Sequence, residues 1–118
     1  MKPDDFVDAL KSECRDAAVA GCLASFKKPP GRKPAAELLR VSQWFHSLSA
    51  ADREVLKLAL MDVADSTLFG VLCVLDGVRV VEDSDEKSEF TLTATRIGER
   101  SQISPNDTFL HDLLRSEP

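Results

Sequence analysis

Residues 55–77 read VLKLALMDVADSTLFGVLCVLDG, and this stretch decides the fold. Its apolar residues recur three and four positions apart, which is the spacing of a helix. They fill two rows of the helical wheel, so we expect a long central helix that neighbouring elements cover on two sides. The helix either runs unbroken or is interrupted near 65–67 or at Gly70. Asp76-Gly77 supplies an exit in which the glycine adopts a left-handed conformation.

Two further helices are predicted upstream of this stretch. The first covers residues 4–26, and the second covers 35–47, with Ser49 placed to cap the helix that follows it. A single turn joins the second and third helices, so residues 35–77 are expected to form a helical hairpin. Between the first two lies KKPPGRKP, residues 27–34, which we interpret as a basic, proline-rich linker. The stripe expected to face the core in the first helix consists of Phe6, Ala9, Leu10, Ala17, Ala20 and Leu23.

The periodicity changes after residue 77. Phe90, Leu92 and Ala94 alternate with threonines, which is typical of a strand. Residues 78–104 are therefore predicted to contain a β-hairpin, and residues 106–115 a short terminal helix. The expected fold class is α+β: a helix-rich bundle of three to four helices, a C-terminal β-hairpin and a short helix at the end.

Length and composition indicate one folded domain, 1–118. The chain is 43% hydrophobic and 30% charged, the profile of a globular protein. Its three cysteines are expected to be reduced and to act as small buried hydrophobes. The first residues lack the features of a secretory signal, and only ten uncharged residues separate Asp65 from Asp76, fewer than the about 20 apolar ones of a membrane span. We therefore expect a cytoplasmic protein without a membrane segment.

The net charge of −5 is unevenly placed along the chain. Residues 61–118 hold five basic and twelve acidic side chains, a net charge of −7. Such a half repels the phosphates of nucleic acids, so direct DNA or RNA binding is not expected. It would attract a protein partner with a basic surface.

Two acidic features could bind such a partner. On an unbroken helix, Asp62, Asp65, Phe69 and Asp76 fall on one strip with Cys73, which suggests an acidic docking strip with an aromatic anchor. The alternative is that Phe69 and Cys73 belong to the core and the aspartates cap or edge the helix. The second feature is the loop EDSDEKSE, residues 82–89. Its proposed partner contacts are Glu82, Asp83, Asp85 and Glu86.

Catalytic chemistry finds little support in this sequence. The 82–89 loop lacks the spacing and the glycine of an EF-hand, and no cysteine and histidine cluster suggests zinc. His46 and His111 are the two histidines, and neither lies in a recognisable nucleophile or base motif. We expect no catalytic residues, no metal and no cofactor.

Three segments read together resemble a group of small uncharacterised bacterial proteins. They are WFHSLSAADREVLKLALMDVADSTLFGVLCVLDGVRVVED, then FTLTATRIGER, then NDTFLHDLLR, and they span about the last two thirds of the chain. Proteins of this kind are similar in size and acidity to immunity proteins, the cytoplasmic antidotes paired with secreted bacterial toxins. The resemblance implies a protein partner and no catalytic residues.

The leading hypothesis is a non-enzymatic, acidic protein-binding domain, in its most concrete form an immunity protein that inhibits a toxin by direct binding. One alternative is a small ligand-binding domain or enzyme with a pocket between the helices and the hairpin, which a cavity lined by His46, His111 or Cys73 would favour. A third interpretation is a structural or homodimeric subunit of an assembly.

Overall fold

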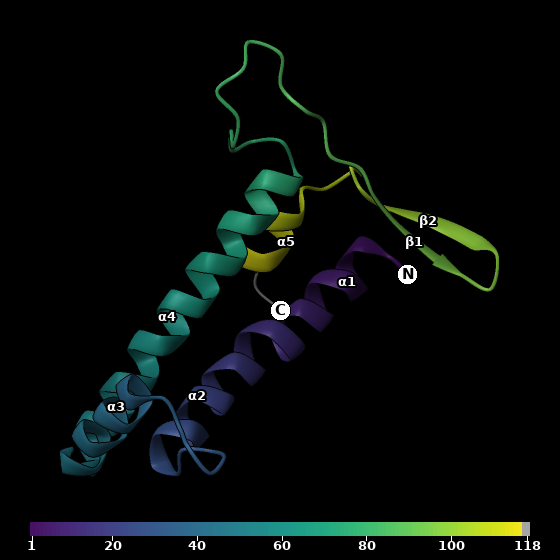
Figure 1. The fold of residues 1–118 in the computed structure, drawn as a ribbon. Helices are drawn as coiled ribbons and strands as arrows, with labels where there is room; N and C mark the ends of the chain where they lie inside the picture. Colours follow the sequence, from purple (N-terminus) through teal and green to yellow (C-terminus); the bar gives the residue numbers. More distant parts are fainter. Residues whose placement is uncertain (117–118) are drawn as a thin grey trace.

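The computed structural model describes residues 1–116, which form a helix-rich α+β fold (Figure 1). Two long helical arms diverge from one end of the molecule, and a two-stranded hairpin extends from the N-terminal arm's far end (Figure 1). In chain order the elements are α1 (Pro3–Leu10), a π-helical segment η1 (Lys11–Asp16), α2 (Ala17–Lys27), α3 (Ala36–Ser47), α4 (Ala50–Leu75), β1 (Leu92–Arg96), β2 (Glu99–Ser104) and α5 (Leu110–Arg115). The α+β class predicted from the sequence is confirmed.

The long helix α4 begins and ends where its sequence signals place it. The hydroxyl of Ser49 accepts a hydrogen bond from the backbone N–H of Asp52 at 3.1 Å, the expected N-terminal cap. At the other end Gly77 has φ 76°, a left-handed conformation that glycine adopts without a steric penalty. The helix is unbroken through residues 65–70, so the interruption considered for this segment does not occur.

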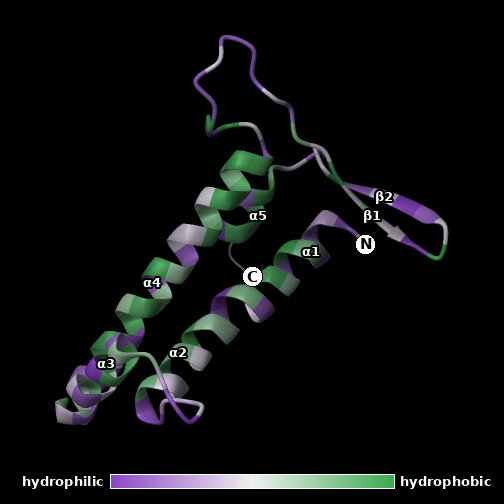
Figure 2. Cartoon of the chain, in the orientation of Figure 1, coloured by the Kyte–Doolittle hydropathy of each residue, from purple (hydrophilic) through white to green (hydrophobic). Residues whose placement is uncertain are grey.

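The expectation that neighbours cover α4 on two sides is wrong. The helix packs against η1, α2 and α5, but Val55, Leu58 and Val63 are each more than 60% exposed. The dense apolar pattern therefore produces a helix with one packed side and one apolar side in contact with solvent. Figure 2 shows hydrophobic residues along most of α4.

The π-helical segment η1 changes which residues of the N-terminal arm face the core. Ala17 donates its backbone N–H to the carbonyl of Ser12, five residues earlier, so this turn holds one residue more than an α-turn. On an unbroken α-helix Val7 and Val19 would lie about 120° apart, and one extra residue removes about 100° of that difference. Both are buried, whereas Ala9, Ala17 and Ala20 of the predicted stripe are exposed.

Helix α3 packs mainly against α2, not against α4. The hydroxyl of Ser42 donates to the carbonyl of Phe26 at 2.6 Å, and the rings of Phe26 and Phe45 have centroids 6.2 Å apart. The pairing of helices 35–47 and 49–77 into a hairpin of their own is therefore wrong, although Arg53 joins the two by donating to the Phe45 carbonyl at 3.3 Å. The basic linker, residues 27–34, turns the chain between α2 and α3.

The β-hairpin is shorter than the region predicted for it. Strands β1 and β2 are antiparallel and pair Thr95 with Arg100 and Arg96 with Glu99. The turn between them uses Ile97 at φ 51° and Gly98 at φ 77°. Residues 78–91 contain no strand, and the terminal helix begins at Leu110 and not at residue 106.

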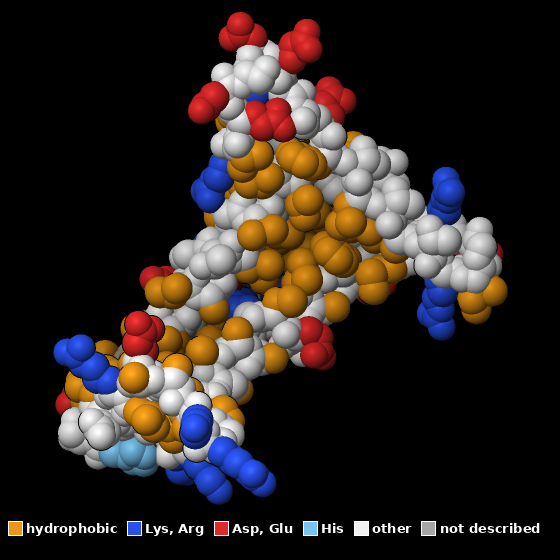
Figure 3. All heavy atoms as spheres, in the orientation of Figure 1, with side chains coloured by type: hydrophobic (Ala, Val, Ile, Leu, Met, Phe, Trp, Pro, Cys, Tyr) orange, Lys and Arg blue, Asp and Glu red, His pale blue; other side chains and the backbone are white. Residues whose placement is uncertain are grey.

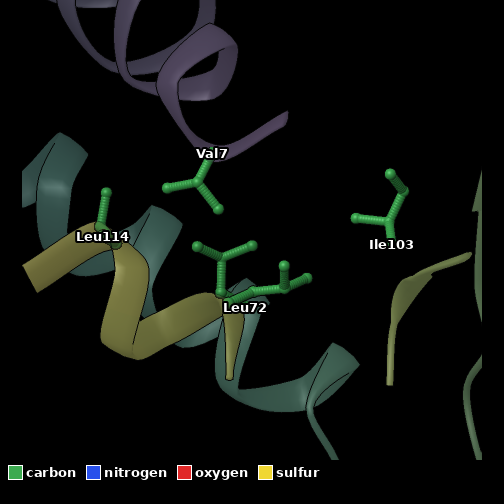
Figure 4. Close-up of a cluster of buried hydrophobic side chains, with 5 residues drawn as sticks. Val7, Leu72, Ile103 and Leu114 are labelled. Atoms are coloured by element: carbon green, nitrogen blue, oxygen red, sulfur yellow. The ribbon is translucent and has the colours of Figure 1, made fainter. Parts of the chain in front are cut away.

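The core is small and joins both ends of the chain. Val7 of α1 points toward Leu72 of α4 and Leu114 of α5, and Ile103 comes from the hairpin (Figure 4). Leu110 completes the buried cluster. Among the cysteines, Cys73 is buried, but Cys14 and Cys22 are exposed, so the prediction of three buried thiols is correct for one. All three are free, as expected.

Candidate functional site

The acidic loop, residues 82–89, projects beyond the C-terminal end of α4 (Figure 3). Its own hydrogen bonds hold it closed. The Ser88 backbone N–H donates to the Glu82 carboxylate at 2.9 Å, and the Lys87 ammonium donates to the Glu82 carbonyl at 2.6 Å. These bonds use Glu82 internally and leave four other carboxylates exposed. The exposed ones are Asp83, Asp85, Glu86 and Glu89.

The environment of Glu82 favours its charged form. Hydrogen bonds from the side chain and the backbone of Ser88 lower the pKa of the Glu82 carboxyl below its ordinary value. A carboxylate that accepts hydrogen bonds is stabilised relative to the protonated acid, which explains the direction. Glu82 therefore stays charged, and its bond with Ser88 serves to shape the loop.

An apolar patch adjoins the acidic loop. Val80, Val81 and Phe90 line one shallow hollow with Val74 of α4, and they remain 66%, 59% and 39% exposed. Exposed Val71 and Val78 extend this surface. We use the name apolar patch for Val71, Val74, Val78, Val80, Val81 and Phe90.

Arg79, in the chain segment that carries this patch, lies close to α4 at Gly70. The Cβ atom of any other residue at position 70 would lie 2.5 Å from Nη1 of Arg79, so the guanidinium rests on the helix backbone. The backbone N–H groups of Val78 and Arg79 both donate to the carbonyl of Cys73. The segment after α4 is thus folded back on the helix end. Sequence analysis missed this contact, and the glycine within an apolar helix was its one visible signal.

The predicted acidic strip on α4 is not a free surface. Asp62 is exposed, but Asp65 accepts a hydrogen bond from Arg15 at 3.0 Å and forms an ion pair with Arg115 at 3.0 Å. The hydrogen bond from Arg15 to Asp16, together with Asp65, raises the pKa of the Arg15 guanidinium, which therefore stays charged. The prediction that Asp65 offers its charge to a partner is wrong, because residues from η1 and α5 neutralise it.

Phe69 and Asp76 are also engaged inside the molecule. The Arg115 guanidinium lies 4.4 Å from the centroid of the Phe69 ring, and His111 meets the same ring edge-on. The Asp76 side chain is only 2% exposed, and it accepts hydrogen bonds from the backbone N–H groups of Leu110 and His111. Both residues join α4 to α5, so the alternative interpretation of them as core and cap residues is the correct one.

The side chains that would favour a catalytic pocket do not converge. His46 lies in α3, close to the Lys27 carbonyl at 2.8 Å, while His111 lies in α5 beside Asp76 at the opposite end of α4 (Figure 1). Cys73 is buried in α4. Two larger open grooves exist, one of about 940 Å³ between Met1, Asp5 and the hairpin, and one of about 630 Å³ beside Arg15 and Asp65. Neither is lined by His46, His111 or Cys73.

No group of three or more histidine, cysteine or carboxylate side chains within residues 1–116 is arranged to hold a metal ion. Helix α4 has the length and composition of a membrane-spanning helix, and only 17% of its most apolar stretch is buried. Any stretch of α4 long enough to span a membrane includes Asp62 and Asp65, which lie outside the ten uncharged residues between Asp65 and Asp76.

Comparison of this chain with protein families, with curated proteins and with solved structures finds no match.

Proposed function

We propose that this chain is a non-enzymatic protein-binding domain that docks on a basic protein surface through the acidic loop, residues 82–89. The observation that carries the proposal is the combination of four exposed carboxylates in a self-closed loop with an exposed apolar patch beside it. Protein interfaces commonly have an apolar centre and a charged rim. The apolar patch would supply the buried area, and the acidic loop would orient the partner.

The charge of the chain supports this assignment. A net charge of −5, concentrated in the second half, favours encounter with a basic partner and disfavours acidic ones. The loop's shape is set by its own hydrogen bonds, so binding would not need to order it first, which reduces the entropic cost of association. Asp62, which is exposed, remains a candidate contact, and Asp65, Phe69 and Asp76 do not.

The most concrete form of this proposal is an immunity protein. The resemblance of residues 44–114 to small acidic bacterial proteins supports it, and its partner would be a cognate toxin whose active surface is basic. An antidote is expected to be encoded beside its toxin, so the product of the neighbouring gene is the partner to test. The immunity protein would act in the cytoplasm.

The test measures, by calorimetry at low and at high salt, how tightly the product of the neighbouring gene binds the wild-type chain, a loop variant and a control variant. Reversing three loop carboxylates should weaken binding about tenfold or more, and high salt should have a similar effect on the wild-type protein. A matched control reverses three exposed carboxylates elsewhere and should leave binding within about threefold of wild type. The loop variant carries Asp83→Lys, Asp85→Lys and Glu86→Lys, and the control carries Glu13→Lys, Glu54→Lys and Glu99→Lys.

Growth of cells that express the neighbouring product gives a second readout. Wild-type chain and the control variant should protect such cells, and the loop variant should protect them poorly. Equal binding and equal protection by all three proteins would refute the role of the acidic loop.

A further inference from the structure

The described chain exposes far more surface than a compact protein of its mass. Its accessible surface is 8765 Å², whereas a folded monomer of 13.0 kDa is expected to expose about 6,300 Å². The excess of roughly 2,400 Å² on each chain, counted twice, falls in the range of obligate dimer interfaces, about 2,000 to 5,000 Å² in total. A second chain could therefore cover most of the surplus surface.

The shape of the molecule agrees with this. The radius of gyration is 18.3 Å, against about 13.5 Å for a compact domain of this length. The core that holds α1, α4, β2 and α5 together has five buried side chains. On the face shown in Figure 3, apolar side chains gather between α4, α1 and the hairpin, and we call this the open face.

Two clusters of opposite charge lie at opposite ends of the molecule (Figure 3). The acidic loop, with five carboxylates and one lysine, follows the C-terminal end of α4. The basic linker, residues 27–34, holds four basic residues and lies near the N-terminal end of α4 (Figures 1 and 3). The helix between them has 26 residues, a length of about 39 Å. The acidic loop, with a net charge of −4, thus follows the C-terminal end of α4, and the basic linker, with a net charge of +4, lies near its N-terminal end.

We propose that a second copy of this chain covers the open face, related by a two-fold axis that places the acidic loop of each copy over the basic linker of the other. A two-fold dimer uses the same surface twice, so a contact between one loop and one linker is automatically repeated at the other end. The apolar side chains supply the buried area, and the two charged contacts exclude the parallel arrangement, in which like charges would meet.

A second copy fits this face better than a membrane does. Asp62 is exposed on α4, and a charged aspartate at the centre of a spanning helix costs about 2.5 to 3.5 kcal/mol or more. Asp65 is bound to arginines from η1 and α5, so a spanning α4 would have to lose these ion pairs or take their partners with it. The acidic loop would also be repelled by anionic lipid headgroups.

This inference deepens the proposed function in one respect, because it gives the acidic loop a first basic partner in the linker of a second copy. A foreign basic protein would then compete with the second copy for the loop. The experiment below separates the two ideas, since it uses the purified chain without any foreign protein.

Sedimentation velocity of the purified full chain, over a hundredfold range of micromolar concentrations, measures its mass in solution. We expect a dimer that is weakened about tenfold or more when either charged end is reversed, and restored when both are reversed together. The exposed-carboxylate control described above should dimerise like the wild type, which excludes an effect of net charge alone. The acidic-end variant carries Asp83→Lys, Asp85→Lys and Glu86→Lys, the basic-end variant carries Lys28→Glu, Arg32→Glu and Lys33→Glu, and the third carries all six.

Each outcome decides the matter. A wild-type chain that is monomeric at every concentration overturns the inference, and it leaves the binding of a foreign basic protein to be judged by its own assay. If neither charge reversal weakens the dimer, or if the combined variant does not restore it, the pairing of the acidic loop with the basic linker is overturned. A chain that does not dimerise but floats with phosphatidylcholine vesicles would show that a membrane covers the open face. This result also overturns the inference of a dimer. Circular dichroism confirms that each variant is folded.

Discussion

The Asp76 carboxylate joins the end of α4 to the start of α5. It accepts hydrogen bonds from the backbone N–H groups of Leu110 and His111 at 3.0 and 2.9 Å, and the His111 ring nitrogen lies 2.6 Å away. The first N–H groups of a helix have no partner within the helix, so a carboxylate there acts as a cap, supplied here by a distant part of the chain. One side chain thereby fixes α5 against α4 and closes the core around Leu72 and Leu110.

Replacing Asp76 with alanine should lower the free energy of unfolding by about 2 to 3 kcal/mol, because it removes the cap and the partner of a half-buried histidine. Asp76→Asn keeps an oxygen that can accept a backbone bond and should cost less. Urea denaturation measures both. The control, Asp62→Ala, changes an exposed aspartate and should stay within about 0.5 kcal/mol of wild type. Equal losses at positions 62 and 76 would contradict the role given to Asp76.

The acidic loop should respond to acid in a defined direction. Because the folded-state pKa of Glu82 is lowered, its hydrogen bonds with Ser88 are fully present above the ordinary glutamate pKa and are lost as the pH falls through the lower folded value. The amide resonance of Ser88, followed by NMR, should therefore titrate with a midpoint below that of an ordinary glutamate. Ser88→Ala should move the midpoint up toward the ordinary value, and an unchanged midpoint in this variant would refute the assignment.

Among the elements, η1 does the most to set the packing of the N-terminal arm. Its extra residue rotates α1 relative to α2 so that Val7 and Val19 are both buried, and it brings Arg15 to Asp65. In a regular α-helix with the same sequence, either Val7 or Val19 would face solvent. The π turn is therefore part of how this arm packs against α4 and α5.

Deleting Ser12 should convert this turn into a regular α-turn and rotate α1 by about 100° relative to α2. Val7 would then leave the core, and the free energy of unfolding should fall by about 2 kcal/mol or more, as for other losses of a buried aliphatic side chain. Thermal unfolding followed by circular dichroism measures the loss. Ser12→Ala keeps the chain length and should remain close to wild type, so a deletion that is equally harmless would show that the π turn has no packing role.

For the whole molecule, the proposed dimer predicts that stability depends on association. Only folded chains can associate through the open face. Mass action should therefore raise the midpoint of thermal unfolding as the protein concentration rises. Differential scanning calorimetry across a tenfold or greater concentration range measures this shift. The basic-end variant, with its weakened dimer, should show a smaller shift and a lower midpoint than wild type at the same concentration. A midpoint independent of concentration in the wild-type protein would contradict association through this face.

Much of this protein follows from its sequence alone. Helix α4, its Ser49 cap, its exit at Gly77, the alternating strand residues around Leu92 and the charge difference between the loop and the linker are all properties of neighbouring residues. Periodicity and capping act over a few positions along the chain, which is why a sequence pattern predicts them. The same reasoning supplied the acidic loop as the candidate partner contact.

Only the tertiary structure decided which carboxylates are free and which apolar side is packed. Asp65 meets Arg15 and Arg115, and Asp76 meets the start of α5, across separations of 34 to 50 residues. Such contacts depend on how the helices are placed in space, and a one-residue π turn rotates an entire helical face without a clear mark in the periodicity. The pattern of neighbouring residues determines where an element begins, ends and turns. Which residue pairs with a charge, and which element covers an apolar face, depend on residues far apart in the sequence.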